Sequence, residues 1–310
     1  MVQRETWARL TLFFCAGVLF SAAAGDRSSA ARGAATGEKT DEQAAVQAER
    51  YWTRAAARND AAGISAALDE QFAWTDAHGT TRTRAQVMKD LAALAADNQG
   101  ETDLQTFHYG HVEVITGVHK NARFMRVWVE RPAGWRAFAI VDTGMAGGVA
   151  PFSTAAGGAG GDCENPCRAI PYQPATEADQ AIVGILERLK MDEWHPNPDD
   201  WARYVIDDVF YVSSAAALSK ADRVAHLAEQ KKSGGAILPG DPVISMQLFD
   251  FGPAGKPDAA VMITRNAPYR GGKPYYSVRV WALRDGRWQL ANSQQTTIAG
   301  AAEVAAVGSR

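Results

Sequence analysis

The 310-residue sequence has few cysteines and no excess of basic side chains. It contains three cysteines, and 35 acidic side chains stand against 32 basic ones, which gives a formal net charge of −3. Such a chain has no strongly positive field to attract phosphates, so we expect no nucleic-acid partner. With 46% hydrophobic and 22% charged residues, the composition is that of a globular protein rather than a disordered or collagen-like chain. The length suggests about two domains.

Long apolar runs are absent outside the N-terminus. Residues 1–24 combine Arg4 and Arg9 with an apolar run over 10–20 and the small residues Ser21-Ala-Ala-Ala24, which is the three-part pattern of a secretory signal peptide. The run is shorter than the roughly 20 residues of a membrane span. We therefore expect a secreted or periplasmic protein, with cleavage near Ala24 and no stable membrane insertion. The alternative is a short N-terminal anchor that is retained.

Cysteine is confined to three positions. Removal of the signal peptide takes away Cys15 and leaves Cys163 and Cys167, and an even number of cysteines in an oxidising compartment favours a disulfide. Redox exchange and metal binding are the alternatives. However, the gap differs from the two residues of thioredoxin-like motifs, and no histidine lies nearby to complete a four-ligand zinc site. We predict a structural disulfide that stiffens a linker.

Small residues and prolines divide the rest of the chain. We expect a flexible leader over residues 25–40, a Gly/Pro-rich linker over 147–175 and a disordered tail over 300–310. Two blocks remain, residues 41–146 and 176–299, and each has the length of a small domain.

The two blocks repeat the same order of motifs. Arg126-Val-Trp128 returns as Arg279-Val-Trp281, and each tripeptide is followed by a further tryptophan at the same spacing. Upstream, Phe72-Ala-Trp-Thr75 aligns with Phe210-Tyr-Val-Ser213. The second block is longer before its last strands, and residues 250–258, which contain glycines and prolines, are the predicted insertion.

Each block begins with helical periodicity and ends with strand-like segments. In the first block, apolar residues recur at helical spacing over 41–58, and further helices are predicted around Ile64 and after Thr83. Asp285-Gly286 is one of the hairpin turn signals between the later strands. We therefore predict an α+β fold in which about three helices pack on one face of a curved antiparallel sheet in each block. The predicted strands are 104–118, 123–131 and 135–142, and then 243–251, 259–266, 275–283 and 288–296.

This order and two local motifs resemble the NTF2-like superfamily, in particular its SnoaL-like and ketosteroid-isomerase-like branch. The motifs are F-x-W-T-D-A-H-G-T-T-R-T-R-A over residues 72–85 and R-F-M-R-V-W-V-E-R-P-A-G-W-R over residues 123–136. The resemblance covers nearly all of the first block and the second more loosely. It implies two tandem cone-shaped domains, each enclosing a pocket. It does not imply one reaction, because the superfamily includes isomerases, cyclases, dehydratases and members without chemistry.

Asp76 is the candidate catalytic residue. The resemblance places it where ketosteroid isomerases have the aspartate that moves a proton between carbons, and a carboxylate in an apolar cleft can act as a general base. The tyrosine donor of that family falls at Trp52, beside Tyr51, and its protonated acid falls at Arg126. Arg126 could stabilise an oxyanion, bind a carboxylate or pair with Asp76 and silence it. In the alternative interpretation, Asp76 only hydrogen-bonds the backbone of its own turn.

Further pocket positions follow from the same pattern. The second block keeps the arginine as Arg279 but aligns Ser214 with Asp76, so it has no equivalent base. Arg279 could also be a strand residue whose stem covers apolar surface, and the tryptophans could be core residues. Besides Asp76 and Arg126, the predicted pocket residues are Tyr51, Trp52, Trp74, His78, Trp128, Asp142, Ser214, Arg279, Trp281 and Gln294, with Ser213 and Asn292 as further candidates.

The sequence predicts neither a metal site nor a cofactor. The histidines lack ligand spacing, no glycine-rich phosphate loop follows a strand, and no nucleophile elbow is present. Because the catalytic set is incomplete, we expect an exported protein that binds a small apolar or anionic ligand, or a partner, in the pocket of the first block. The alternatives are an isomerase, cyclase or dehydratase with Asp76 as base, and an association module whose domains pair with each other or form a homodimer.

Overall fold

The structure is a computed structural model. It describes residues 44–91, 100–145, 162–213, 217–234, 241–267 and 273–299, all within one compact unit. The predicted signal peptide, leader and tail, the first part of the predicted linker and Ser214 lie outside the described residues. Among the helices that are described, none has the length and apolar character needed to cross a membrane.

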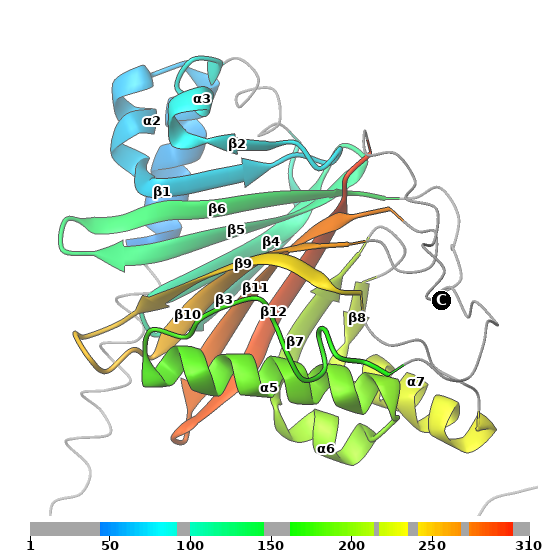
Figure 1. Cartoon of the computed structure of the whole chain (residues 1–310). Helices are drawn as coiled ribbons and strands as arrows, with labels where there is room; N and C mark the ends of the chain where they lie inside the picture. Colours follow the sequence, from blue (N-terminus) through cyan, green and yellow to red (C-terminus); the bar gives the residue numbers. More distant parts are fainter. Residues whose placement is uncertain are drawn as a thin grey trace, which may run out of the picture. The chain divides into compact units, whose positions relative to one another are not determined.

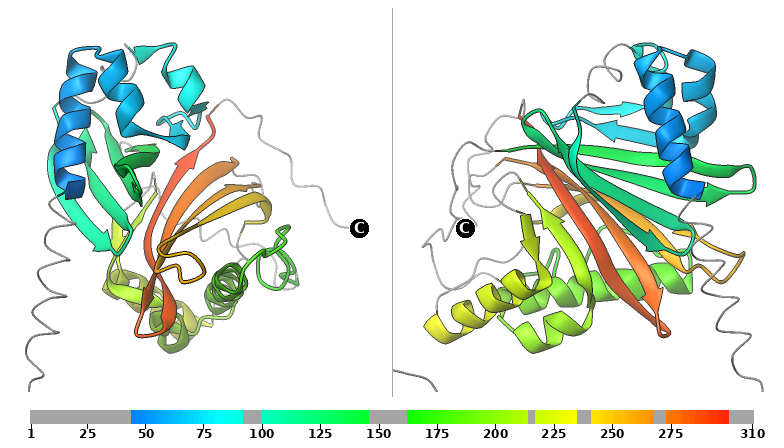
Figure 2. Two further views of the ribbon diagram at one scale, coloured as in Figure 1. Left: turned by 90° about the vertical axis from the view of Figure 1, so that its left-hand side faces the viewer. Right: turned by 180° about the vertical axis from the view of Figure 1, so that it is seen from behind.

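The first half packs helices on a six-stranded sheet (Figure 2). Residues 44–57 are helical, and α2 (Ala61–Ala67) begins after Asp60, whose side chain accepts a hydrogen bond from Gly63 N. α3 (Arg84–Val87) follows the second strand. The strands are β1 (Leu68–Thr75), β2 (Thr81–Thr83), β3 (Thr102–Tyr109), β4 (Val112–His119), β5 (Ala122–Arg131) and β6 (Gly134–Gly144).

The second half repeats this arrangement, and α5 runs along one face of its sheet (Figure 1). Its helices are α5 (Glu177–Trp194), α6 (Pro198–Arg203) and α7 (Lys220–Ser233). Its strands are β7 (Val205–Val212), β8 (Ala217–Ser219), β9 (Val243–Phe251), β10 (Ala259–Asn266), β11 (Tyr275–Arg284) and β12 (Arg287–Thr297). The strand orders β2-β1-β6-β5-β4-β3 and β8-β7-β12-β11-β10-β9 match position by position. The predicted α+β fold with two tandem domains is confirmed.

Two details of the predicted sheets are wrong. The sheets are mixed rather than purely antiparallel, because β1 pairs with β6 and β7 with β12 in parallel. Residues 104–118, predicted as one strand, form the hairpin of β3 and β4, which turns at Gly110 with a φ of 61°. The flanking residues continue the β pattern, but the left-handed backbone at this glycine ends the strand. The loop between β9 and β10 is longer than this turn, in line with the insertion predicted at 250–258.

The strand register shows which residues of the two halves correspond. Arg126 pairs with Ile140, and Arg279 pairs with Ser293. In both sheets a bulge lies between the second and third residue of the Arg-Val-Trp motif. Arg279 therefore corresponds to Arg126, and Ser293 corresponds to Ile140.

The first strand of each half is aligned by the same neighbours. Trp74 pairs with Ile140 of β6, and Tyr211 pairs with Ser293 of β12. Because Ile140 and Ser293 are equivalent, Trp74 and Tyr211 correspond as well. Two residues further on, Asp76 corresponds to Ser213. The sequence alignment with Ser214 is wrong by one position, because it matched two phenylalanines that the register places one position apart.

The helices also correspond residue by residue. Three residues join the 44–57 helix to α2, and three residues join α5 to α6. Because the connections have the same length, the helix residues can be matched by counting back from the equivalent residues Trp74 and Tyr211. Glu49 then corresponds to Leu186, and Trp52 corresponds to Leu189. All four side chains face the sheet of their own half and are buried.

The second face of each sheet packs against the other half. Val127 of β5 and Val280 of β11 belong to one apolar cluster that spans both sheets. Gln294 Nε2 donates a hydrogen bond to Val141 O at 2.7 Å, and Thr296 Oγ1 also bonds the backbone of β6. The two halves thus share a buried interface with apolar and polar contacts.

The described end of the predicted linker packs on the second half. The disulfide between Cys163 and Cys167 is confirmed, and both cysteines are buried. Ile170 belongs to the core of the second half, and the Asn165 side chain both donates to and accepts from the backbone of Val243. The disulfide therefore lies in a packed segment and not in a free linker.

Candidate functional site

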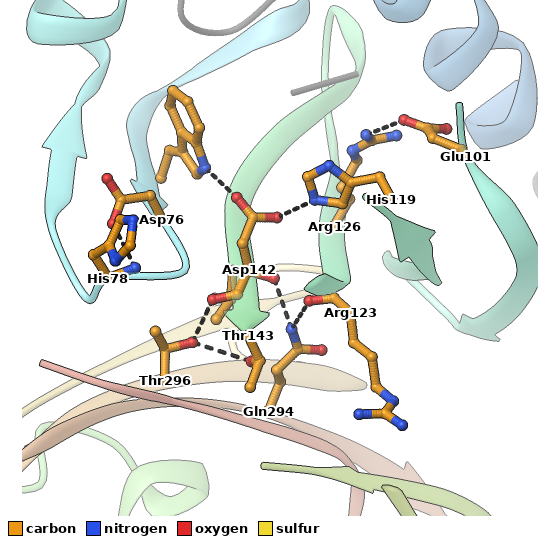
Figure 3. Close-up of polar contacts among 12 residues, drawn as sticks. Asp76, His78, Glu101, His119, Arg123, Arg126, Asp142, Thr143, Gln294 and Thr296 are labelled. Atoms are coloured by element: carbon orange, nitrogen blue, oxygen red, sulfur yellow. Dashed lines mark hydrogen bonds and ion pairs between the residues drawn. The ribbon is translucent and has the colours of Figure 1, made fainter. Parts of the chain in front are cut away.

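Asp76 lies in the turn after β1. One carboxylate oxygen accepts hydrogen bonds from His78 N and Thr80 N at 3.0 Å, and the other accepts from Arg82 Nη1 at 2.8 Å. Figure 3 shows Asp76 and His78 together on this loop, whereas Arg126 projects from another strand. These contacts are those of the turn interpretation. The catalytic role of Asp76 stays a prediction.

Arg126 is neutralised inside the first half. It is almost fully buried, and its guanidinium pairs with Glu49 and Glu101. The Phe124 ring lies 4.3 Å from its Cζ atom, and Trp128 Nε1 donates to the second oxygen of Glu49 at 2.7 Å. Burial alone would lower the pKa of Arg126, but the two carboxylates raise it. The protein itself thus neutralises the charge of this arginine.

A second buried network fills the rest of this interior. Asp142 accepts a hydrogen bond from Trp74 Nε1 at 2.7 Å and pairs with His119 Nε2 at 2.9 Å (Figure 3). Tyr51, another predicted pocket residue, is 45% exposed. The large side chains packed inside the first half include Trp52, Trp74, Phe124, Trp128 and Ile140. The predicted pocket residues of this half thus act mainly as core and as buried pairs.

The second half encloses a cavity of about 320 Å³ between its helices and its sheet. This volume lies at the lower end of the range for small-molecule sites. The apolar part of the wall comes from Leu186, Leu189, Leu218 and Leu290. The polar part comes from α5, α7 and the strands β7, β11 and β12.

Smaller residues explain why the second half is hollow. By register, Ser277 and Ser293 occupy the positions of Phe124 and Ile140. A leucine stands where the first helix has Trp52. Each change removes side-chain volume from the space between the helices and the sheet, and such a loss leaves a cavity where the surroundings do not collapse.

Arg279 lines this cavity at the position equivalent to Arg126 and is equally buried. Among the described residues its hydrogen-bond partner is Thr264 Oγ1, to which Nη1 donates at 3.0 Å, and no carboxylate lies within ion-pair distance. The counterpart of Glu49 is Leu186. Burial lowers the pKa of Arg279, yet a guanidinium remains protonated in proteins. A buried cation therefore faces the cavity without a counter-ion from the described chain.

The carboxylate on α5 is already paired. Glu193 forms ion pairs with Lys190 Nζ at 2.8 Å and with Arg223 Nη2 at 3.1 Å. Burial would raise the pKa of Glu193, but the two cations outweigh burial and lower it to about 2. Glu193 is thus a fixed anion that pairs directly with Lys190 and Arg223 and acts on Arg279 only over a longer distance.

Two tyrosines complete the polar wall. Burial raises the pKa of both Tyr211 and Tyr275, so both hydroxyls stay neutral and can donate hydrogen bonds. Tyr275 also hydrogen-bonds Asp241, which lines the cavity as well. Three cationic and two acidic side chains line the cavity, which leaves an excess of one positive charge over the whole lining.

Part of this site was predicted from the sequence. The predicted residues Arg279 and Ser213 both line the cavity. Trp281 is buried in the adjacent core, whereas Gln294 faces the first half. Within the described residues, no group of three or more His, Cys, Asp or Glu side chains is placed to hold a metal ion. The polar and charged lining residues that were not predicted from the sequence are Lys190, Glu193, Tyr211, Arg223, Asp241, Tyr275, Ser293 and Gln295.

Some of the missed residues left a signal in the repeat. Arg223 stands where the first half has Val87, and Ser293 stands where it has Ile140, when the two halves are aligned by register. Polar residues in place of buried apolar ones mark the positions where the interior has changed from core to cavity. A residue-by-residue alignment of the blocks would have found them.

No protein-family model and no curated protein matches this chain. Several solved structures are similar to it. An NTF2-like protein from Cytophaga hutchinsonii is 16% identical over 32% of this chain and 94% of its own, with a TM-score of 0.28. An NTF2-like protein with a cystatin-like fold from Novosphingobium aromaticivorans is 17% identical over 41% and 96%, with a TM-score of 0.33. A proposed ketosteroid isomerase from Shewanella frigidimarina is 14% identical over 32% and 94%, with a TM-score of 0.29.

Proposed function

We propose that this protein binds a small organic ligand in the cavity of its second half, and that the first half serves as its structural partner. The observation that carries this proposal is the contrast between two equivalent interiors. One is filled with large side chains and has its arginine neutralised, whereas the other is hollow and has a buried arginine without an ion-pair partner among the described residues. Buried charges are normally paired, so an unpaired one beside a cavity points to a ligand.

Binding without covalent chemistry fits the groups at the site. The Glu193 carboxylate is held as an anion by two cations, so it is a poor proton acceptor. Asp76, the base of the alternative function, belongs to the first half and is engaged by its own turn. We therefore favour a binding protein over an isomerase, cyclase or dehydratase.

We also place this activity outside the cytoplasm. The Cys163–Cys167 disulfide supports an oxidising compartment, because disulfides are rare in proteins of the cytosol. The sequence pattern of residues 1–24 is the second reason for this proposal.

The test is to fill the cavity by replacing Ser293 with the larger residue that the first half has at the equivalent position. In Ser293→Ile, the side chain of Ile140 is introduced at the equivalent position of β12. Binding of benzoate, hexanoate, benzamide and hexanamide is measured by calorimetry and mapped by NMR. We expect at least one of these probes to bind the full-length protein at one site and to shift the resonances of residues that line the cavity. Ser293→Ile should weaken that binding at least tenfold.

Two further variants complete the design. Leu218→Trp blocks the cavity from β8 and should act like Ser293→Ile, so the result does not depend on one substitution. Ile140→Val, in the filled interior of the first half, should leave binding unchanged. If none of the four probes binds, or if binding is insensitive to both blocking variants, the proposed function is incorrect.

A further inference from the structure

The first half shows what a carboxylate does at the arginine position. Glu49 reaches Arg126 with one oxygen and Trp128 Nε1 with the other. A single carboxylate from the helix therefore satisfies two buried donors of β5. A charge-assisted hydrogen bond of this kind is stronger than a neutral one.

The second half keeps both donors but lacks the acceptor. Arg279 and Trp281 stand at the equivalent positions, whereas Leu186 replaces the glutamate. Trp281 Nε1 is buried and has no hydrogen-bond partner among the described residues, and Arg279 donates to the neutral hydroxyl of Thr264. The second half thus keeps the two buried donors of the first half but lacks the carboxylate that accepts their hydrogen bonds.

From this gap we infer that the ligand is a monocarboxylate with an apolar body, and that its carboxylate binds Arg279 in place of the missing glutamate. The inference rests on the proposed ligand-binding function. The planar guanidinium matches the geometry of a carboxylate and can bind it through two parallel hydrogen bonds. The neutral hydroxyl of Tyr211 is a further donor at the cavity wall.

The charge of the cavity limits the anion to one negative charge. Glu193 already neutralises part of the positive charge of Lys190 and Arg223, and the excess over the whole lining is a single positive charge. A dianion such as phosphate would remain partly uncompensated in a buried site, which is costly. The site therefore favours a monocarboxylate over inorganic phosphate.

The apolar wall determines the rest of the ligand. Four leucines from α5, β8 and β12 line the cavity beside the arginine, namely Leu186, Leu189, Leu218 and Leu290. A carboxylic acid with an aliphatic or aromatic body would bury this surface, whereas a small polar acid would leave it in contact with water. The volume of about 320 Å³ suits a compact acid.

The experiment compares matched acids and amides on the full-length protein. Benzoate and hexanoate are titrated at pH 7 beside benzamide and hexanamide, which have the same shape without the charge, and beside inorganic phosphate. We expect each acid to bind at least tenfold more tightly than its amide, and phosphate to bind more weakly than either acid. In Arg279→Met, each acid should lose its advantage over the matched amide.

Leu186→Glu tests directly whether the ligand carboxylate takes the place of the missing glutamate. The new glutamate stands where Glu49 stands in the first half, so it should pair with Arg279 and weaken binding of the acids at least tenfold. The amides should change by less than threefold. Leu186→Met, which is similar in size and neutral, is the matched control and should retain acid binding. Circular dichroism of each variant checks its fold, and Arg279→Met gives the same comparison if Leu186→Glu does not fold.

The outcomes separate this inference from the proposed function. If acids and amides bind the cavity equally well, if phosphate binds most tightly, or if both Leu186→Glu and Arg279→Met leave acid binding unchanged, the carboxylate assignment is overturned while ligand binding stands. If no acid and no amide binds, the proposed function itself fails.

Discussion

Arg126 and Arg279 occupy the same register position in two sheets of identical strand order, yet only Arg126 has carboxylate partners among the described residues. The chain thus contains a filled and a hollow version of one interior. The difference follows from a few substitutions, of which the change from Glu49 to Leu186 removes the counter-ion. The filled half serves as an internal reference for the hollow one.

Replacing each arginine by methionine should affect stability very differently in the two halves. Arg126→Met leaves the buried Glu49 and the partly buried Glu101 without their cation and should lower the free energy of unfolding by about 3–5 kcal/mol. Arg279→Met removes a buried cation that no described carboxylate neutralises, so it should change stability by less than about 1 kcal/mol or raise it. Urea unfolding without ligand at pH 7 measures both. A larger loss for Arg279→Met than for Arg126→Met would contradict this description of the two sites.

The turn contacts of Asp76 predict a structural effect. Asp76→Ala removes the acceptor of His78 N and Thr80 N and should lower the free energy of unfolding by about 1–2 kcal/mol. Asp76→Asn keeps one side-chain oxygen for these donors and should cost less than half as much. Thermal unfolding of the three proteins compares them. Equal stability of wild type and Asp76→Ala would show that the turn does not depend on this carboxylate.

The repeat was visible in the sequence because arginine and tryptophan recur at the same spacing in both blocks. The Arg-Val-Trp motifs mark β5 and β11, and the positions of Arg126 and Arg279 are equivalent in the structure as well. The disulfide followed from counting cysteines. These features are local in the chain, so periodicity and spacing are sufficient to find them.

The cavity could not be predicted in the same way. It depends on volumes contributed by several elements, such as Ser293 on β12 and Leu189 on α5, and on which face of a strand each residue takes. A shift of one residue moves a side chain to the opposite face of a sheet. The alignment of Ser214 with Asp76 contained such a shift, and the register gives Ser213 instead. The pairing of Glu49 with Arg126 joins a helix to a distant strand, and nothing in the local sequence marks it.

Gly110 should tolerate no side chain. Its φ is 61°, and a Cβ atom would lie 2.5 Å from Cγ of Asp258. That carboxylate is held by His111, whose Nδ1 lies 2.7 Å from it, so it cannot easily move away. Gly110→Ala should therefore lower the free energy of unfolding by about 2–3 kcal/mol, through backbone strain and a steric clash between the halves.

Gly286→Ala is the matched control for this clash. Gly286 also has a positive φ, of 72°, but a Cβ there would meet nothing within 4 Å. The control should cost only about 1 kcal/mol, from the backbone conformation alone. Chemical denaturation gives both values, and similar losses for the two variants would exclude a steric contribution from Asp258.

Asp192 should make stability depend on pH near neutrality. It lies almost fully buried on α5, and burial, followed by the charge of Asp200 on α6, raises its pKa to about 7, although Arg188 acts in the opposite direction. In the unfolded chain an aspartate has a pKa of about 3.9. Because the folded protein holds the proton more tightly, the stabilisation is complete below about pH 4 and is lost as the pH rises towards 7.

Asp192→Asn tests this titration because asparagine keeps the shape of the protonated acid. In the wild type, the free energy of unfolding should fall by about 2 kcal/mol between pH 4 and pH 7, and the variant should lose most of that slope. Asp199→Asn, an exposed aspartate on α6, is the control and should retain the wild-type slope. Urea unfolding across the pH range measures all three. If Asp192→Asn keeps the full wild-type slope, Asp192 does not cause the pH dependence of stability and the prediction is wrong.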